Sequence, residues 1–290
     1  MLPLPSIPRA ALGPIAFGAL LVIIAWAYVN LRPPPTRFAP SSAVAPPVMV
    51  GQAPPAPGVA TATPVPLSGA AIALGGGLTL SVADGLFDEQ QQARLRVELD
   101  RALDYVVARF GTAPIATIGT YVGLAPGCGL HGIAYTDVRT VQVFTCRDLP
   151  MARAVNILAH EFVHQLAHDR YGDRHLRADL ILSEGVATWG AGAYWLGGAS
   201  DFRGFVRPWV SRGEQLPLAL SYVGLPISDM NKLYYQWASF VEYLIDSYGR
   251  ERFDALYLSG NAAPGSADYQ GIYGKGLDQL EAEWRAWVLQ

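Results

Sequence analysis

Two histidines and a glutamate in this chain stand at a spacing that suits a metal site. Residues 160–164 read HEFVH, an H-E-x-x-H pattern. If the stretch is helical, His160 and His164 are four residues apart on one face, so both imidazoles can bind one zinc ion. Glu161 can then reach a water at that metal and take its proton. Three of the five histidines lie within residues 159–169, a clustering expected of a metal site.

The residues around this motif predict a helix. Asp148 is a suitable N-cap, Pro150 suits the first helical turn, and Gly172 is a natural stop. Apolar residues recur between them at helical spacing without an internal breaker, at Ala154, Ile157, Leu158, Phe162, Val163 and Leu166.

A catalytic zinc takes three protein ligands, and Glu184 is the best candidate for the third. It follows His164 by 20 residues and is the only acidic residue within 182–196. A lone carboxylate among apolar residues needs a partner, because burying an unpaired charge is costly. The alternative is an exposed glutamate near a helix start, favoured by the helix dipole. His168 lies eight residues, about 12 Å of helix, beyond His160, so it cannot share the ion and is expected at the surface or beside the ligands.

Composition excludes some classes of protein. The 290 residues are 51% hydrophobic and 16% charged, so a substantial core can form. The net charge is −3 with no basic run, which gives no basis for nucleic-acid binding. Cys128 and Cys146 stand 18 residues apart. They can be two buried thiols or one disulfide, and their placement at a loop and a strand end in an exported domain favours the disulfide.

Residues 1–31 predict a membrane anchor or a signal sequence. Ala10–Val29 is a run of 20 residues without a charge, long enough to span a bilayer as a helix. Its length favours an uncleaved single-pass anchor, although residues 25–27 resemble a signal-peptidase site. Either interpretation exports the remainder of the chain. The expected location is the cell membrane with the catalytic domain outside the cytoplasm, or secretion if the segment is cleaved.

Two further regions come after the anchor. Residues 32–68 are rich in proline and alanine and predict an extended, semi-rigid linker. Residues 69–290 predict the catalytic domain. Strands are expected near 77–82, 115–122 and 140–146, with a loop at 125–132, and helices at 87–110, 178–196, 233–248, 250–258 and 277–288. This order predicts an α+β fold, with a small mainly antiparallel sheet followed by a helical half and the zinc site between them.

The chain resembles the gluzincin metallopeptidases, the clan of thermolysin-like enzymes and aminopeptidases with a zinc-binding glutamate on a second helix. It is most similar to the bacterial peptidase MA-like domains of that clan. The resemblance covers roughly residues 69–290. The segments that carry it are HEFVHQLAH at 160–168, SEGVATW at 183–189, YYQWASFVEYLIDSYGRERF at 234–253 and, more weakly, LDQLEAEWRAWV at 277–288.

The resemblance implies specific roles for several residues. It implies one Zn²⁺ per chain, bound by His160, His164 and Glu184, with Glu161 as the general base. It also implies a tyrosine at the start of a later helix that hydrogen-bonds the tetrahedral oxyanion. That role is assigned to Tyr234, with the adjacent Tyr235 as the alternative. No histidine occurs after His175, so none can hold the oxyanion from downstream.

The chain departs from the clan in two places. A G-x-M-E-N element is absent from the sequence, which argues against removal of N-terminal residues. Thr188 stands where thermolysin-like enzymes carry an acid that supports the first histidine. Asp179 or a backbone carbonyl could take that supporting role, and Asp179 could equally be a solvated acid at a helix start.

The expected function is that of a membrane-tethered zinc peptidase, an endopeptidase acting on a peptide or protein substrate. An extended substrate could pair with the strand at 140–146 as an added edge. One alternative is a non-proteolytic zinc-binding module of the same fold that binds an envelope protein or polymer. Another is a tethered structural domain with an incidental motif. The presence of Glu161 favours catalysis over pure binding, and metal content tests the incidental motif.

Overall fold

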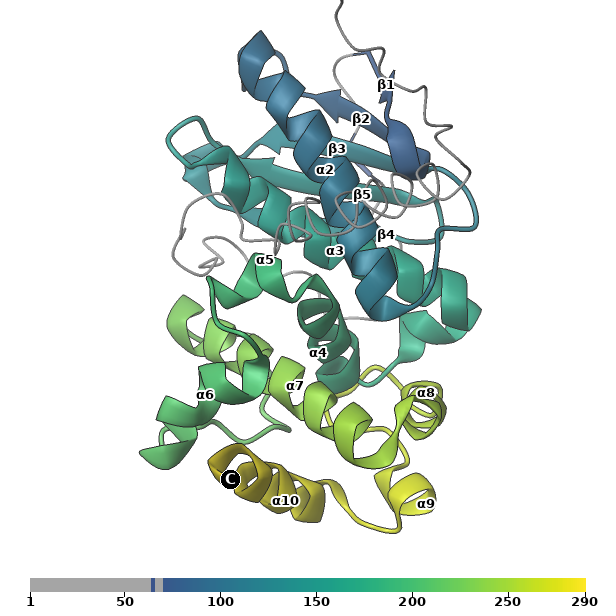
Figure 1. Ribbon diagram of the computed structural model, residues 1–290, viewed down its shortest axis with the longest axis vertical. Helices are drawn as coiled ribbons and strands as arrows, with labels where there is room; N and C mark the ends of the chain where they lie inside the picture. The colour runs from purple at the N-terminus through teal and green to yellow at the C-terminus, as the bar shows by residue number, and fades with distance from the viewer. Residues whose placement is uncertain (1–63, 66–69) are drawn as a thin grey trace, which may run out of the picture. The chain divides into compact units, whose positions relative to one another are not determined.

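A five-stranded sheet opens the described part of the chain. The computed structural model describes residues 64–65 and 70–290 (Figure 1). Across the sheet the strands run β1 (Ile72–Ala73), β2 (Leu78–Val82), β3 (Ile118–Leu124), β5 (Thr140–Thr145) and β4 (His131–Tyr135). The hairpin β4–β5 therefore inserts its second strand next to β3 and leaves β4 at the edge.

The strand directions are mixed, so the expectation of a mainly antiparallel sheet was wrong. β2 pairs with β3, and β3 with β5, in parallel, whereas β1–β2 and β4–β5 are antiparallel. The reason lies in α2 (Glu89–Phe110), which connects β2 to β3. A helical crossover returns the chain to the same end of the sheet, and this gives parallel neighbours. β4 was missed because its first residues fall in the glycine-rich stretch predicted as a loop.

Helix α2 forms where the apolar periodicity predicted it. Asp88 caps it by accepting a hydrogen bond from the Gln91 backbone N–H at 2.7 Å, and the Gln91 side chain accepts one from Asp88 N–H at 2.9 Å. Gly111 ends it with φ +80°, a left-handed conformation that glycine adopts without steric cost. The predicted stripe is buried: Leu95, Leu99, Ala102, Leu103, Val106 and Phe110.

Helix α3 (Met151–Tyr171) carries the H-E-x-x-H motif and packs against α2, β4 and β5. It ends at Gly172 as predicted, but its start differs from the prediction. Pro150 occupies the N-cap position without a side-chain hydrogen bond, so Asp148 does not cap the helix. Proline's φ of −56° leads directly into the first turn, where its missing N–H costs nothing.

Mainly helical structure forms the rest of the chain, drawn in green to yellow in Figure 1. The single helix expected over 178–196 is two helices, because Gly192, with φ +41°, breaks it. Helices α6 and α9 were not predicted, and α7 begins at Ile227 rather than near 233. The elements are a 3-10 turn (Gly172–Arg177), α4 (Leu180–Ala191), α5 (Ala193–Leu196), α6 (Phe202–Ser211), α7 (Ile227–Tyr248), α8 (Arg250–Tyr257), α9 (Tyr269–Tyr273) and α10 (Leu277–Leu289).

Helices α4 and α7 cross closely, and this contact positions the candidate site. Gly185 makes the approach possible, since a Cβ there would lie 2.7 Å from the Trp237 carbonyl oxygen of α7. The adjacent Glu184 is thereby held close to Tyr234 on α7. The site thus draws on three helices: α3, α4 and α7.

Several sequence expectations concern other parts of the chain. Cys128 and Cys146 form a disulfide, with their Cα atoms 5.0 Å apart. The predicted anchor at 10–29 and most of the linker lie outside the described residues, and the domain boundaries stay predictions. Within residues 64–65 and 70–290, no helix has both the length and the apolar character needed to cross a bilayer.

Candidate metal centre

Three potential ligands converge between α3 and α4. The Nε2 atoms of His160 and His164 are 3.2 Å apart, and the Glu184 Oε2 lies 3.2 Å from the first and 3.6 Å from the second. All three donor atoms fall within 4.8 Å of one another. The four-residue spacing on α3 aligns the two imidazoles, and α4 presents Glu184 to both.

Burial makes the charges in this group interact strongly. Burial lowers the pKa of His160. Burial alone would raise the pKa of Glu184, but the charge of His164 and hydrogen bonds from both imidazoles outweigh it and hold that pKa well below its usual range. For His164, burial is likewise outweighed, here by the Glu184 carboxylate, so its pKa is raised. Glu184 is therefore ionised, and a bound metal ion would favour the neutral form of both imidazoles.

Thr188, rather than Asp179, supports the first histidine. The Thr188 Oγ1 lies 3.3 Å from the His160 Nδ1, the ring atom turned away from Glu184. Asp179 is fully buried at the N-terminus of α4 and accepts hydrogen bonds from the backbone N–H groups of Ile181, Gly265 and Ala267 and from the Tyr269 hydroxyl. Of the alternatives left open from the sequence, Asp179 is thus neither a support for His160 nor a solvated acid.

Glu161 lies against the edge strand β4. A Cβ added to Gly132 would come within 2.5 Å of the Glu161 Oε1, so the absence of a side chain at this position gives the carboxylate its room. Burial raises the pKa of Glu161 to about 8, the charge of His164 opposes this rise, and that of Glu184 adds to it. A nearby cation would lower this pKa again. No sequence pattern indicated this contact, because Gly132 is one of several glycines in a stretch predicted as a loop.

The two candidate tyrosines on α7 lie in different environments. The Tyr234 ring is 5.8 Å from the His160 ring, and its hydroxyl is buried without a hydrogen-bond partner among the described residues. Burial, and then the charge of Glu184, raise the pKa of Tyr234 well above its ordinary value. The Tyr235 hydroxyl instead donates to the Trp195 carbonyl at 2.9 Å. Tyr234 therefore faces the metal ligands, and Tyr235 joins α7 to α5.

Two aromatic residues at the site were not anticipated from the sequence. Trp195 of α5 places its ring 5.1 Å from that of His160 and stacks on Tyr234 at 6.1 Å. Tyr222 comes from the connection between α6 and α7, and its ring lies 5.9 Å from that of Tyr234. Aromatic residues at such spacing usually belong to a core, so only the fold could indicate that they form a wall of this site.

The remaining histidines near the motif have other partners. The His168 Nδ1 lies 2.7 Å from the Thr136 Oγ1, as expected for a histidine that is not a ligand. The His175 Nδ1 lies 2.7 Å from the Tyr257 hydroxyl, and burial lowers the pKa of His175 well below its ordinary value. Its ring is 5.6 Å from that of His164, so it lines the ligand side as a neutral imidazole.

The residues present fit a zinc ion. Two neutral imidazoles and one carboxylate are a donor set that catalytic zinc sites use, with a fourth position left open. The buried Tyr234 hydroxyl without a partner among the described residues points to a polar occupant beside these donors. Cys128, Cys146 and Asp148 also lie within reach of one another, but their two sulfurs form the disulfide and offer no thiolate.

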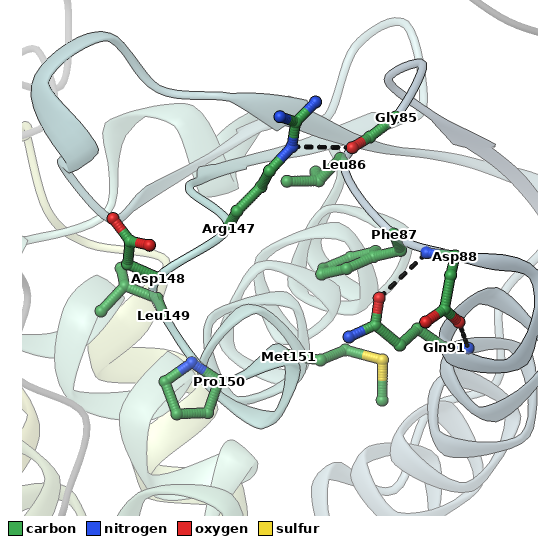
Figure 2. Close-up of a pocket in the computed structure, with 10 residues that line it drawn as sticks. All are labelled: Gly85, Leu86, Phe87, Asp88, Gln91, Arg147, Asp148, Leu149, Pro150 and Met151. Carbon is green, nitrogen blue, oxygen red and sulfur yellow. Dashed lines mark hydrogen bonds between the residues drawn. The ribbon is translucent and has the colours of Figure 1, made fainter.

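A separate cavity of about 490 Å³ lies at the starts of α2 and α3 (Figure 2). Arg147 lines it and donates to the Gly85 carbonyl at 2.8 Å, and the capping pair Asp88 and Gln91 forms another part of its wall. None of the predicted site residues line it. This cavity is therefore distinct from the group formed by His160, His164 and Glu184.

Comparison with known proteins gives structural neighbours only. No protein-family model and no curated protein match the chain. An M1 zinc metallopeptidase from Deinococcus radiodurans is 19% identical, with a TM-score of 0.40 over 77% of this chain and 51% of that one. A variant of the same enzyme is 18% identical, with a TM-score of 0.41 over 77% of this chain and 51% of that one. A two-domain M1 variant bound to L-arginine is 18% identical, with a TM-score of 0.38 over 76% of this chain and 50% of that one. The chain thus spans about half the length of these structures.

Proposed function

We propose that this protein is a zinc-dependent peptidase that cleaves internal bonds of a peptide or protein substrate. The observation that carries the proposal is the group formed by His160, His164 and Glu184, whose donor atoms lie within 4.8 Å of one another. Glu161 and Tyr234 border the same group. Ligand donors, a potential base and a potential hydrogen-bond donor are the parts that amide hydrolysis requires.

His160, His164 and Glu184 would hold one zinc ion. When bound, zinc supplies a Lewis acid that polarises a carbonyl and lowers the pKa of a water molecule. The other tasks fall to the chain itself. Thr188 orients the imidazole of His160 through its Nδ1, and this kind of support strengthens metal binding.

Glu161 is the proposed general base. Its buried carboxylate accepts a proton from the attacking water on an Oε atom and later passes it to the leaving amine. A cation held by the ligand group would lower the pKa that burial raises, and this would leave the carboxylate ionised and able to accept the proton. Gly132 leaves the carboxylate free of steric contact on the side of β4.

Tyr234 is the proposed donor to the substrate oxygen on which negative charge develops. Its hydroxyl makes no hydrogen bond of ordinary geometry among the described residues and lies near the Glu184 carboxylate, so it is placed to donate to a charge that develops beside the ligand group. A donor already in place costs little reorganisation when the charge appears, which is the basis of such stabilisation.

Strand β4 is the proposed edge for an extended substrate. The strand first expected in this role, β5, has a neighbour on both sides, β3 and β4, so it cannot accept a further strand. β4 ends the described sheet and lies beside Glu161 through Gly132. An added strand would present its peptide bonds to the base.

Cleavage inside a chain is proposed because the sequence lacks the G-x-M-E-N element that would bind the free amine of a substrate's first residue. We further propose that residues 10–29 anchor the domain in the cell membrane with the site outside the cytoplasm, because that run is long enough to span a bilayer.

Zinc stoichiometry and peptide hydrolysis of the full-length chain test the proposal together. The wild type should bind one zinc per chain, Glu184→Gln should bind it more weakly, and Glu161→Gln should keep it. Loss of the base should reduce turnover of an unstructured protein such as casein by about 10²–10⁴-fold. Zinc binding that is indifferent to Glu184 would refute the three-ligand site.

The alternative of a zinc-binding module without catalysis predicts a different pattern. Under this alternative the wild type binds one zinc per chain, Glu184→Gln weakens that binding, and the wild type hydrolyses no peptide. Absence of zinc altogether would instead indicate an incidental motif. Lys232→Gln serves as the matched control, because this half-buried residue contacts the Glu214 carbonyl rather than the ligand group.

A further inference from the structure

One side chain of the central sheet bonds to the proline-rich segment that precedes it. Gly132 faces Glu161 of α3, so its register partner Val143 also points to the α3 side of the sheet. Successive residues of a strand alternate in direction. Gln142 therefore points to the opposite face, which we call the outer face.

Gln142 is an unusual residue for this position. It is fully buried in an interior strand between Val141 and Val143, and a buried amide is stable only when hydrogen-bonded. Both of its polar atoms bond to one residue. The Val65 N–H donates to the Gln142 Oε1 at 3.1 Å, and the Gln142 Nε2 donates to the Val65 carbonyl at 3.0 Å.

The pattern of these bonds is that of a strand pair. A residue directs its N–H and C=O groups to the same side when its backbone is extended, and hydrogen-bonded residues of antiparallel strands exchange both groups in this way. The Gln142 amide takes the place of one such residue. Val65 is 45% exposed, and Gln142 bonds to its main-chain groups and not to its side chain.

The surroundings of Gln142 suit a proline-flanked segment. Tyr121 of β3 and Ile133 of β4 stand opposite Gln142 in register and share its face. The Phe144 ring lies 6.1 Å from that of Tyr121. The sequence around Val65 reads TPVPL, and aromatic surfaces with a few amide groups bind extended proline-rich peptides.

We propose that the outer face of the sheet is a docking surface for the end of the chain's own proline-rich segment, fastened at Val65 by the Gln142 amide. The segment is then fixed to the domain before β1 begins and does not join it as a free spacer. Because the sheet separates Gln142 from Glu161, the fastened end leaves from the face opposite the ligand group. This inference does not depend on the proposed function.

Two matched pairs of variants in the full-length chain test the docking. Val65→Pro removes the donated N–H, whereas Val65→Ala keeps both main-chain groups. Gln142→Leu removes both side-chain partners at similar volume, and exposed Gln90→Leu is its control. Limited proteolysis of the segment around residues 60–70 and hydrogen exchange at the Val65 amide are the measurements.

Docking predicts that Val65→Pro and Gln142→Leu speed cleavage of this segment by about tenfold or more, while Val65→Ala and Gln90→Leu match the wild type. The Val65 amide should exchange at least about tenfold more slowly in the wild type than in Gln142→Leu. If Gln142→Leu fails to fold, the Val65 pair alone decides, since Val65 is exposed and precedes β1. Equal cleavage of Val65→Pro and Val65→Ala, or wild-type exchange as fast as in an unstructured peptide, would overturn the proposal.

Discussion

Adjacent tyrosines on α7 differ in what their hydroxyls contact. Tyr234 points to the ligand group without a partner among the described residues, whereas Tyr235 donates to the Trp195 carbonyl. In a helix, neighbouring residues are rotated by about 100° from one another, so only one of the two can face α3. The pair therefore offers an internal control for the role of the phenol.

We expect Tyr234→Phe to reduce kcat without loss of zinc. Removing a donor to a developing oxyanion typically costs about 10²–10³-fold in kcat. Tyr235→Phe loses one buried hydrogen bond and should leave kcat unchanged while lowering stability by about 1 kcal/mol. Kinetics and zinc content of both variants distinguish these effects. A similar kcat for Tyr234→Phe and the wild type would exclude Tyr234 from the chemistry.

Glu242 is a buried acid outside the site. Its Oε2 accepts a hydrogen bond from the Arg203 N–H at 2.9 Å, and its Oε1 lies 3.7 Å from an Arg109 nitrogen. Burial raises the pKa of Glu242 from 4.5 to about 7, and these two partners offset only part of that rise. Between those pH values the folded chain holds a proton that the unfolded chain has lost.

Glu242 should therefore destabilise the protein as pH rises. The sign comes from linkage, since the free energy of unfolding falls with pH wherever the folded state binds more protons. The contribution of Glu242 to the free energy of unfolding is fully favourable below about pH 4.5. Between about pH 4.5 and pH 7 it falls by about 1.4 kcal/mol per pH unit, and above about pH 7 it is constant. Urea unfolding of the wild type and Glu242→Gln from pH 5 to pH 8 should show the difference between them growing. A constant difference would contradict this.

Helix α4 is held at its start by Asp179. The carboxylate joins the first turn of α4 to the loop before α9 through Gly265, Ala267 and Tyr269. Glu184 lies in the next turn of the same helix. Helix α4, which carries the candidate third ligand Glu184, is thus fixed by Asp179, and Asp179 has its hydrogen bonds elsewhere than at the ligand group.

Asp179→Ala should lower stability and leave the ligands of any folded protein intact. The buried N–H groups of Ile181 and Ala267 would lose their acceptor, at about 1–3 kcal/mol each, so we expect a loss of roughly 2–6 kcal/mol. Tyr269→Phe loses one of these bonds and should cost about 1 kcal/mol.

Thr188→Val provides the contrasting variant. It should weaken zinc binding by about 10-fold with little change in stability, because it removes the partner of His160. Urea unfolding and competitive zinc titration measure the two effects separately. If Asp179→Ala weakened zinc binding as much as Thr188→Val without a loss of stability, the roles given to these residues would be reversed.

The disulfide connects parts of the whole molecule that carry the site. It joins the loop before β4 to the residue after β5, and β4 contributes Gly132 beside Glu161. Closing a loop of 18 residues removes conformational entropy from the unfolded chain.

Loss of the disulfide should reduce the free energy of unfolding by about 3 kcal/mol. Urea unfolding with and without reductant measures this, and the Cys128→Ser and Cys146→Ser double variant should match the reduced wild type. Thiol titration confirms that reduction is complete. An unchanged unfolding midpoint after complete reduction would show that the bridge contributes nothing.

The sequence by itself determined the features that depend on local spacing. The H-E-x-x-H pair shares a helix face because the helical repeat is intrinsic to the backbone, and the apolar stripe of α2 arises from the same repeat. Local sequence also identified Glu184, as the only acidic residue within 182–196, and the glycines that end α2 and α3.

Only the tertiary structure decided the features that depend on distant segments. The crossover through α2 makes β2 and β3 parallel, and the insertion of the hairpin β4–β5 makes β3 and β5 parallel. β4 itself forms because pairing with β5 overrides a glycine-rich sequence. The partner of His160, the choice between Tyr234 and Tyr235, and the bond from Gln142 to Val65 all join residues that lie far apart in the chain. Such contacts arise from packing of whole elements, and no local pattern encodes them.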